Sequence, residues 1–219
     1  MQISEFKSFI EGSLLPNIQL KTVSPVEPII VENHTEEWKL LGKGNYAAVF
    51  THPAMPDWVV KIYGRNPEGL QKEIFVYEKL GSHKAYSRLG GYGRSYLILK
   101  RIEGITLFHA MVKGIPIPVS VIHDIDSALQ YARDRGLNPF DVHGKNVVMN
   151  KNRGYIVDIS DFYKSGYCSK WDDLKKAYYW IYRPLILKWH PPFPFRAVDS
   201  IRTLYRLYRK LRKRIKKAD

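Results

Sequence analysis

The chain has 219 residues with a net charge of +14, and its 45% hydrophobic and 26% charged residues are typical of a globular protein, which excludes a disordered or collagen-like chain. Its single cysteine, Cys168, excludes an intrachain disulfide framework and a cysteine-based zinc site, and it favours a reducing, cytoplasmic setting. Glu5 and Glu11 interrupt the start of the chain where a signal peptide needs apolar residues, and no run of about 18 apolar residues follows, so we expect neither secretion by that route nor a membrane span.

The first half of the chain predicts a small sheet preceded by a short helix. Residues 1–37 form an N-terminal extension in which an amphipathic helix leads into a proline-containing connection. From Trp38 onward, short apolar runs alternate with Gly and Pro turns, and one helical pattern at residues 70–83 lies between them. We therefore expect residues 38–103 to form an antiparallel sheet with one inserted helix.

The pattern becomes mainly helical after Gly104. Residues 119–136 place Ile122, Ile125 and Leu129 at helical spacing and end at a glycine. The apolar runs 146–150 and 155–160 flank a turn and predict a hairpin, and residues 170–186 predict a buried helix. Residues 104–195 are therefore expected to form a second, mainly helical lobe.

Two features of the first lobe suggest a phosphate site. Gly42 and Gly44 lie in a predicted hairpin turn, where backbone amides can approach phosphates closely, although an ordinary glycine turn has the same pattern. Lys61 lies inside an apolar strand, where its charge needs an anionic partner unless the strand is an edge with the lysine in solvent. Glu73 and Glu78 on the following helix are the candidate partners.

Two loops of the second lobe carry acidic and amide side chains. Asp141 and Asn146 are five residues apart on one loop, so the aspartate could accept a hydroxyl proton while the amide oxygen binds Mg²⁺. Turn-forming residues in a surface loop are the alternative interpretation. Asp158 and Asp161 follow the hairpin, and their odd separation in a continuous strand would point them to opposite faces. We expect Asp161 to be the one that faces Asn146.

The order of these segments over residues 38–181 resembles the protein-kinase-like superfamily. LGKGNYAAVF is similar to the glycine-rich loop of that family, with Ala47 at the third glycine, and VVKIYG is similar to its lysine strand. KEIFVYEKLGSH resembles the glutamate helix, and YLILKRIEGITL resembles the hinge. The resemblance implies that Glu73 pairs with Lys61 and that ATP is bound by Gly42, Lys43, Gly44, Asn45, Val49, Lys61, the gatekeeper Leu99, Arg101 and Ile102.

The segment PFDVHGKN resembles the catalytic loop of the family. The resemblance implies that Asp141 is the catalytic base and that Asn146 and Asp161 bind Mg²⁺. The loop departs from the family pattern because His143 replaces the lysine that is typical of protein kinases, and Lys145 is the candidate substitute.

Residues 161–174 are similar to the aminoglycoside-phosphotransferase branch, in which a Lys-Trp pair precedes a helix aspartate. The resemblance gives Asp173 the role of holding the catalytic loop. Only about ten residues separate Asp161 from this pair, so a long activation segment has no room.

The end of the chain predicts a basic amphipathic helix at 196–219. Ten Lys or Arg residues there oppose only Asp199 and Asp219, a net charge of +8. An apolar stripe of helical spacing could dock on the second lobe, lie on an anionic membrane or accompany RNA binding, as in the basic segments of some RIO-like kinases. Its members are Ile201, Leu204, Tyr208, Leu211 and Ile215.

Taken with the resemblance, the sequence predicts an α+β, bilobal protein-kinase-like fold. The expected parts are the extension 1–37, the N-lobe and hinge 38–103, a minimal C-lobe 104–195 and the basic helix 196–219. The expected activity is Mg²⁺-dependent transfer of the γ-phosphoryl group of ATP to a hydroxyl, with Ser/Thr of a protein favoured as the acceptor. A small-molecule acceptor remains open, as does a pseudokinase or scaffold that binds anionic partners through its basic end.

Overall fold

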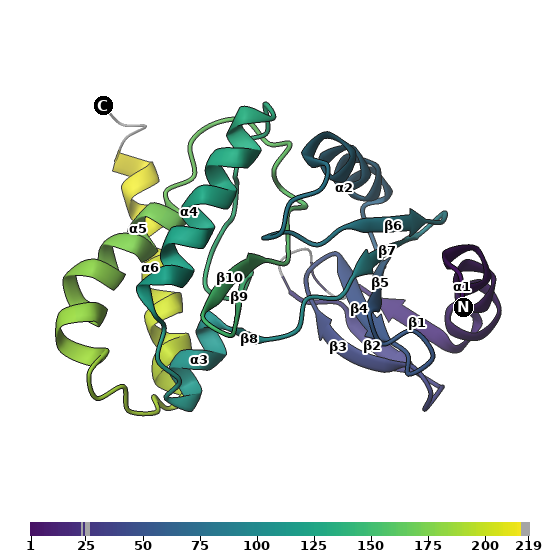
Figure 1. The fold of residues 1–219 in the computed structure, drawn as a ribbon, viewed down its shortest axis with the longest axis horizontal. Coiled ribbons are helices and arrows are strands. Elements are labelled where there is room, and N and C mark those ends of the chain that lie inside the picture. The colour runs from purple at the N-terminus through teal and green to yellow at the C-terminus, as the bar shows by residue number, and fades with distance from the viewer. Residues whose placement is uncertain (23, 25–26, 216–219) are drawn as a thin grey trace.

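The computed structural model describes residues 1–22, 24 and 27–215, and it confirms the α+β class. An antiparallel five-stranded sheet has the strand order β3-β4-β5-β7-β6 (Figure 1). Its strands are β3 (Lys39–Lys43), β4 (Ala47–Thr51), β5 (Trp58–Tyr63), β6 (Leu89–Tyr92) and β7 (Tyr96–Lys100). One helix, α2 (Pro67–Leu80), joins β5 to β6, as the sequence predicted.

The ends of α2 follow from local sequence. Asn66 caps its start, because the side-chain oxygen accepts a hydrogen bond from the Gly69 amide, and Pro67 occupies the first helical position, where no amide donor is needed. Gly81 ends the helix with a φ of +69°, a conformation that glycine adopts without strain. These boundaries fix the register of α2 over the sheet and therefore the position of Glu73.

Residues 1–37 share a hydrophobic core with the five-stranded sheet. Helix α1 (Ile3–Phe9) continues through the helical turns η1 (Ile10–Leu14) and η2 (Leu15–Asn17) into the hairpin β1 (Ile18–Lys21) and β2 (Ile30–Asn33). Phe6 is fully buried and its ring stacks on Trp38 at a centroid distance of 5.8 Å. The extension therefore stabilises the sheet instead of standing apart from it.

The other half of the chain contains a three-stranded sheet and most of the helices. Strands β8 (Ile105–Thr106), β9 (Val147–Asn150) and β10 (Arg153–Ile156) pair in the order β10-β9-β8. The predicted hairpin is present as β9 and β10, but β10 ends at Ile156, earlier than the apolar pattern suggested. The helices are α3 (Leu107–Lys113), α4 (Val119–Asp134), α5 (Lys170–Ala177) with its π-helical continuation η3 (Tyr178–Ile186), and α6 (Phe195–Ile215).

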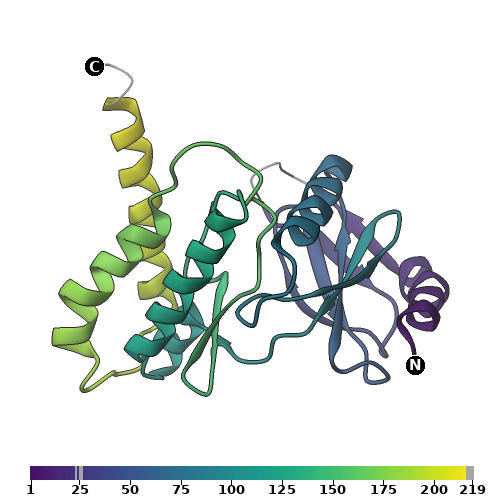
Figure 2. The same cartoon turned by 45° about the horizontal axis from the view of Figure 1, so that its top comes forward.

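The two halves lie side by side along the long axis of the molecule (Figures 1 and 2). A second hydrophobic cluster joins them, because it includes Leu80 of α2 and Leu97 of β7 together with Ile122 and Ile125 of α4. This arrangement is compatible with a bilobal fold.

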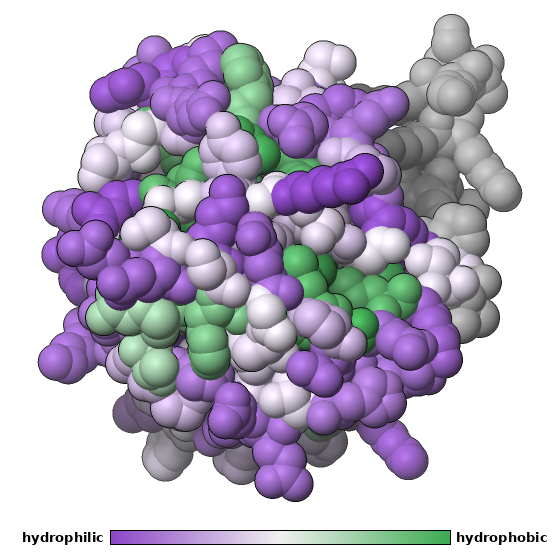
Figure 3. Space-filling view, turned by 90° about the vertical axis from the view of Figure 1, so that its right-hand side faces the viewer, coloured by the Kyte–Doolittle hydropathy of each residue, from purple (hydrophilic) through white to green (hydrophobic). Residues whose placement is uncertain are grey.

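Seen from the end that carries α1, the surface is largely hydrophilic with small hydrophobic patches (Figure 3). Among the described residues, no helix is both long enough and apolar enough to cross a membrane.

Candidate active site

A lysine and two acidic side chains from three segments meet between the two halves. Lys61 Nζ of β5 lies 2.8 Å from Glu73 Oε2 of α2 and 3.3 Å from Asp158 Oδ1, which follows β10. The Glu73 side chain is fully buried, that of Lys61 is 12% exposed, and that of Asp158 is 39% exposed. The cluster is thus anchored in the core at Glu73 and reaches solvent at Asp158.

Strand and helix periodicity explain why these groups meet. Lys61 pairs in register with Val49 of β4 and Leu97 of β7, so it lies on a central strand and cannot be an edge residue. Glu73 lies on the buried face of α2, while Glu78 lies on the exposed face. The ion pair between Lys61 and Glu73 is the one expected from the sequence.

The charges in the cluster depend on one another. Burial opposes the charge of Lys61, but the carboxylates of Asp158 and Glu73 outweigh it and hold the pKa of the ammonium well above its usual value. Burial also raises the pKa of Glu73 despite the attraction of Lys61. At Asp158, burial is outweighed by Lys61 and by hydrogen bonds from Ser160, so the pKa of this carboxyl is lowered. Lys61 and Asp158 are therefore charged at neutral pH.

The structure places Asp158 beside Lys61, whereas the sequence predicted Asp161 as the carboxylate that faces Asn146 and binds the metal. The expectation assumed a continuous strand through both residues, but β10 ends at Ile156 and the alternation of faces ends with it. Beyond the strand, the buried side chains of Ile159 and Phe162 anchor the segment. Asp161 instead forms an ion pair of 2.7 Å with Lys164. The geometry therefore favours Asp158 as the acidic group of the site.

The loop that contains Asp141 and Asn146 is folded back on itself. Asp141 adopts a φ of +63°, which is uncommon for a residue other than glycine and is associated with functional sites. The Asn146 side-chain amide donates a hydrogen bond of 3.2 Å to the Asp141 carbonyl. The Asp141 carboxylate forms an ion pair with Lys170 at the start of α5, and His143 Nε2 lies 3.9 Å away from it. One carboxylate is thus fixed between two basic side chains.

Comparison with known proteins identifies the family of the chain. No family model matches it. It is 32% identical over 167 residues, which are 74% of this chain and 78% of the relative, to the "Putative serine/threonine-protein kinase YrzF" of Bacillus subtilis (strain 168). The chain belongs to this kinase-like family. That membership supports a kinase function in general terms.

In this kinase-like chain the glycine turn lies beside the lysine. Gly42 and Lys43 belong to β3, and the Gly44 amide donates a hydrogen bond of 2.9 Å to the Ala47 carbonyl, which closes the turn at Asn45. Because Val49 on the next strand pairs with Lys61, the turn and the lysine share one region of the sheet.

The predicted hinge includes β7 and the segment that follows it. Leu99 is buried on β7 and lies opposite Val59 of β5. The Arg101 amide donates to the Asp57 carbonyl at 2.7 Å, so this amide is already engaged within the protein. Ile102 follows in the crossing between the two halves.

Lys145 is directed to a different place from Asp141. Its ammonium lies 4.3 Å from the centre of the Phe108 ring and 4.0 Å from Asp199 of α6. The residue that meets the Asp141 carboxylate is Lys170, which the sequence analysis had noted only as part of a Lys-Trp pair. No spacing rule in the sequence could have identified this contact, because 29 positions separate the two residues and no regular element joins them.

Tyr63 was not predicted from the sequence as a residue of the site. Its hydroxyl donates a hydrogen bond to Glu73 Oε2, so both oxygens of the buried carboxylate have partners. The signal was present in the sequence, since Tyr63 is two residues beyond Lys61 and alternate residues of a strand share a face. Asp173, expected to hold the catalytic loop, accepts hydrogen bonds of 2.8 Å from Ser169 and 2.7 Å from Tyr205.

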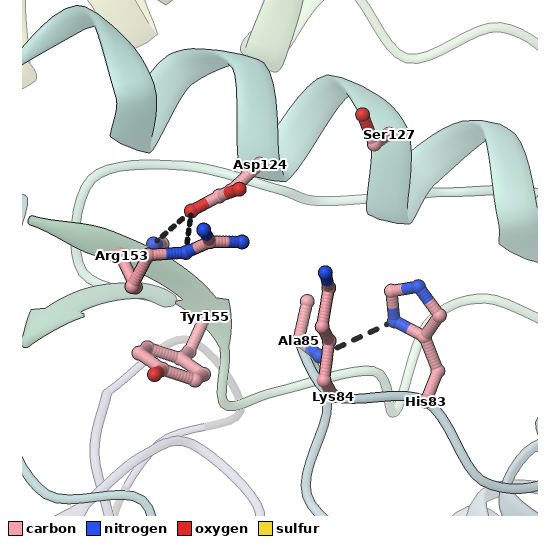
Figure 4. Close-up of a pocket in the computed structure, with 8 residues that line it drawn as sticks. His83, Lys84, Ala85, Asp124, Ser127, Arg153 and Tyr155 are labelled. Carbon is pink, nitrogen blue, oxygen red and sulfur yellow. Dashed lines mark hydrogen bonds and ion pairs between the residues drawn. The ribbon is translucent and has the colours of Figure 1, made fainter.

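A hollow of about 380 Å³ lies elsewhere on the molecule, between α4, the β9–β10 hairpin and the segment after α2 (Figure 4). Asp124 accepts hydrogen bonds there from the Gly154 amide at 3.0 Å and forms an ion pair of 2.9 Å with Arg153. None of the predicted site residues lines this hollow. It is therefore separate from the cluster around Lys61.

Proposed function

We propose that the protein is an ATP-dependent phosphotransferase with a bilobal kinase-like fold, acting at the junction between its two halves. The observation that carries this proposal is the convergence of Lys61, Glu73 and Asp158 from three distant segments of the chain. A buried lysine held by a buried carboxylate is costly, because both charges lose hydration. A purely structural module gains little from such a pair, whereas phosphate binding needs a cation fixed in place.

The phosphate contacts are assigned to the first half of the chain. Lys61 binds the phosphates of ATP, and Glu73 holds the lysine in position through an ion pair of 2.8 Å. The turn at Gly44 and Asn45 lies over the phosphates, and the segment around Leu99 to Ile102 faces the adenine. The raised pKa of Lys61 keeps its ammonium protonated throughout the neutral range.

The metal and the acceptor are assigned to the second half. Asp158 and Asn146 offer carboxylate and amide oxygens, the donor type that Mg²⁺ prefers. Within the described ranges no group of three or more His, Cys, Asp or Glu side chains is placed to hold a metal ion. Bound Mg²⁺ would offset the negative charge of the phosphates.

The acceptor hydroxyl is assigned to Asp141. Its carboxylate accepts the hydroxyl proton as the oxygen attacks the γ-phosphorus of ATP, and the bond from that phosphorus to the bridging oxygen breaks to release ADP. Lys170 supplies a positive charge beside the reacting groups where the family loop usually has a lysine. This role replaces the one that the sequence suggested for Lys145.

Ser or Thr of a protein is our proposed acceptor, because the relative in Bacillus subtilis bears the name of a serine/threonine-protein kinase. A small-molecule hydroxyl is the second candidate. It is favoured by the short connection from Asp158 to the start of α5 at Lys170, which leaves little backbone for docking a protein segment. The supply of ATP and Mg²⁺ and the single cysteine suit a cytoplasmic site of action.

The test is phosphoryl transfer from labelled ATP by the purified full chain, with and without Mg²⁺. Generic protein substrates and small polyols are offered as acceptors, and autophosphorylation is followed at the same time. Transfer that requires Mg²⁺ and is lost in Asp141→Asn supports the proposal, and Asp134→Asn on the exposed end of α4 is the matched control. Binding of ATP without any transfer would indicate the pseudokinase alternative, and the absence of ATP binding would overturn the site altogether.

A further inference from the structure

Helix α6 rests on the rest of the protein through polar and aromatic contacts. The Tyr205 hydroxyl donates a hydrogen bond of 2.7 Å to Asp173 of α5, and Asp199 lies 4.0 Å from the Lys145 ammonium. At the start of the helix, the Phe195 ring meets the Phe108 ring of α3 at a centroid distance of 5.5 Å. These contacts define the side of α6 that faces the protein.

The apolar side of α6 faces solvent instead. Ile201, Leu204 and Leu207 are 64%, 65% and 51% exposed, and their spacing of three places them along one strip of the helix. A helix that docks on a protein core normally buries such a strip. The sequence continues the pattern at Tyr208, Leu211 and Ile215, whose side chains lie outside the described part of the structure. The orientation of α6 therefore leaves an apolar strip without a partner among the described residues.

The charge of this segment restricts what can cover the strip. Residues 196–219 contain ten Lys or Arg residues and carry a net charge of +8. A second copy would bring an equal positive charge against the first, which opposes self-association. RNA would satisfy the charge but offers little to bury Ile and Leu side chains. An anionic lipid surface satisfies both features, since acyl chains accept the apolar strip and the headgroups attract Lys and Arg.

Other apolar side chains are exposed at the same end of the molecule. Trp180 and Leu185 of η3 are 81% and 70% exposed, and Trp189 just beyond it is 79% exposed. Three helical segments, α5, η3 and α6, lie together at the end of the molecule opposite α1 (Figures 1 and 2). Helix α6 extends beyond its neighbours. Tryptophan is enriched where proteins meet the boundary between lipid headgroups and acyl chains.

We propose that α6 is a membrane-docking helix that lies on an anionic phospholipid surface with Ile201, Leu204 and Leu207 at the acyl boundary. Its basic residues contact the lipid headgroups, and the association is peripheral and reversible. The inference depends on the orientation and charge of α6 and is independent of the phosphotransfer proposal. It implies that the protein works next to a membrane although no helix of the described chain spans one.

Flotation of the full-length protein with vesicles tests this inference. We expect binding to phosphatidylcholine vesicles that contain phosphatidylglycerol, weak or no binding to phosphatidylcholine alone, and weaker binding at high salt. The double variant Ile201→Glu, Leu204→Glu should lower the affinity for anionic vesicles about 30-fold or more, because two apolar side chains can no longer be buried. Phe75→Glu is the matched control, since this residue is 52% exposed on α2 and should not alter binding.

A labelled variant gives a second measurement that does not depend on charge substitution. An environment-sensitive dye on Leu204→Cys, in a Cys168→Ser background, should shift to the blue with anionic vesicles, whereas a dye on Phe75→Cys should not. Absence of vesicle binding, or binding that the double variant leaves unchanged, would overturn the proposal. Loss of a dimer in the double variant would assign the strip to a second copy. Binding to RNA without binding to vesicles would assign the helix to nucleic acid.

Discussion

Replacement of Lys61 with methionine should destabilise the protein in a pH-dependent manner as well as abolish transfer. The change removes the ammonium that lies 2.8 Å from the carboxylate of the fully buried Glu73. At an effective dielectric constant of about 20, that distance corresponds to an attraction of about 6 kcal/mol. Among the described residues, Tyr63 would be the remaining hydrogen-bond donor to the carboxylate. A buried anion without its cation is strongly unfavourable.

Protonation of Glu73 sets an upper limit to this electrostatic loss. In the unfolded chain the Glu73 carboxyl has an ordinary pKa of 4.5 and is charged above it, whereas in the folded variant it is neutral. This difference lowers the free energy of unfolding by about 1.4 kcal/mol for each pH unit above 4.5. The loss therefore reaches at most about 4 kcal/mol at pH 7.5 and about 1.4 kcal/mol at pH 5.5. The sign follows because burial already raises the pKa of Glu73 and the variant loses Lys61, which lowers it, so the folded variant binds this proton more readily. A folded state that binds more protons than the unfolded chain becomes less stable as the pH rises.

Urea unfolding followed by tryptophan fluorescence at these two pH values measures the difference. Lys61→Met should lose more stability at pH 7.5 than at pH 5.5, and Glu73→Gln in the same background should recover most of the loss at the higher pH. Lys39→Met, on the exposed face of β3, is the control and should change little. Equal losses at both pH values, or no loss, would refute the argument that Glu73 depends on Lys61 for its charge.

Five further substitutions test the other assignments. Asp158→Asn should abolish Mg²⁺-dependent transfer, because a neutral amide replaces a charged ligand, whereas Asp161→Asn should retain it. The reverse result in a labelled-ATP assay would mean that Asp161 binds the metal. Lys170→Met should lower the rate of phosphoryl transfer by about 100-fold with little change in thermal stability, while Lys145→Met should leave that rate within a few-fold. Equal rates for the two variants in a steady-state assay would contradict a role for the ion pair between Lys170 and Asp141. Phe6→Ala should cost about 3–5 kcal/mol in urea unfolding, because its ring is fully buried against Trp38, and a loss below about 1 kcal/mol would mean that the extension is dispensable.

The sequence was most informative where periodicity and local chemistry agree. The apolar run around Lys61 predicted a strand, the resemblance of the next segment to the glutamate helix favoured Glu73 over Glu78, and the structure joins the two side chains. The hairpin at β9 and β10 was predicted for the same reason, since its turn residues stand between two short apolar runs.

The sequence was less informative where the chain leaves regular structure. The position of Asp158 depends on where β10 ends and on how Ile159 and Phe162 enter the core, and neither can be derived from strand alternation. The contact between Asp141 and Lys170 depends on the path of a loop and on the start of α5. For α6, the sequence predicted an apolar strip but not its direction, because the direction is set by contacts with α3 and α5.

The packing of α1 against the sheet affects how the protein can fold during synthesis. The hydroxyl of Tyr96 on β7 donates a hydrogen bond of 2.8 Å to Glu11, which precedes it by 85 residues. At translation rates of 5–20 residues per second, this distance corresponds to about 4–17 seconds during which the first helix lacks its final neighbours. Phe6 and Ile10, both fully buried in the finished protein, belong to a hydrophobic cluster that includes Tyr96 and Ile98, so their cover is incomplete over that interval. The segment around α1 is therefore one that a chaperone on the ribosome could protect.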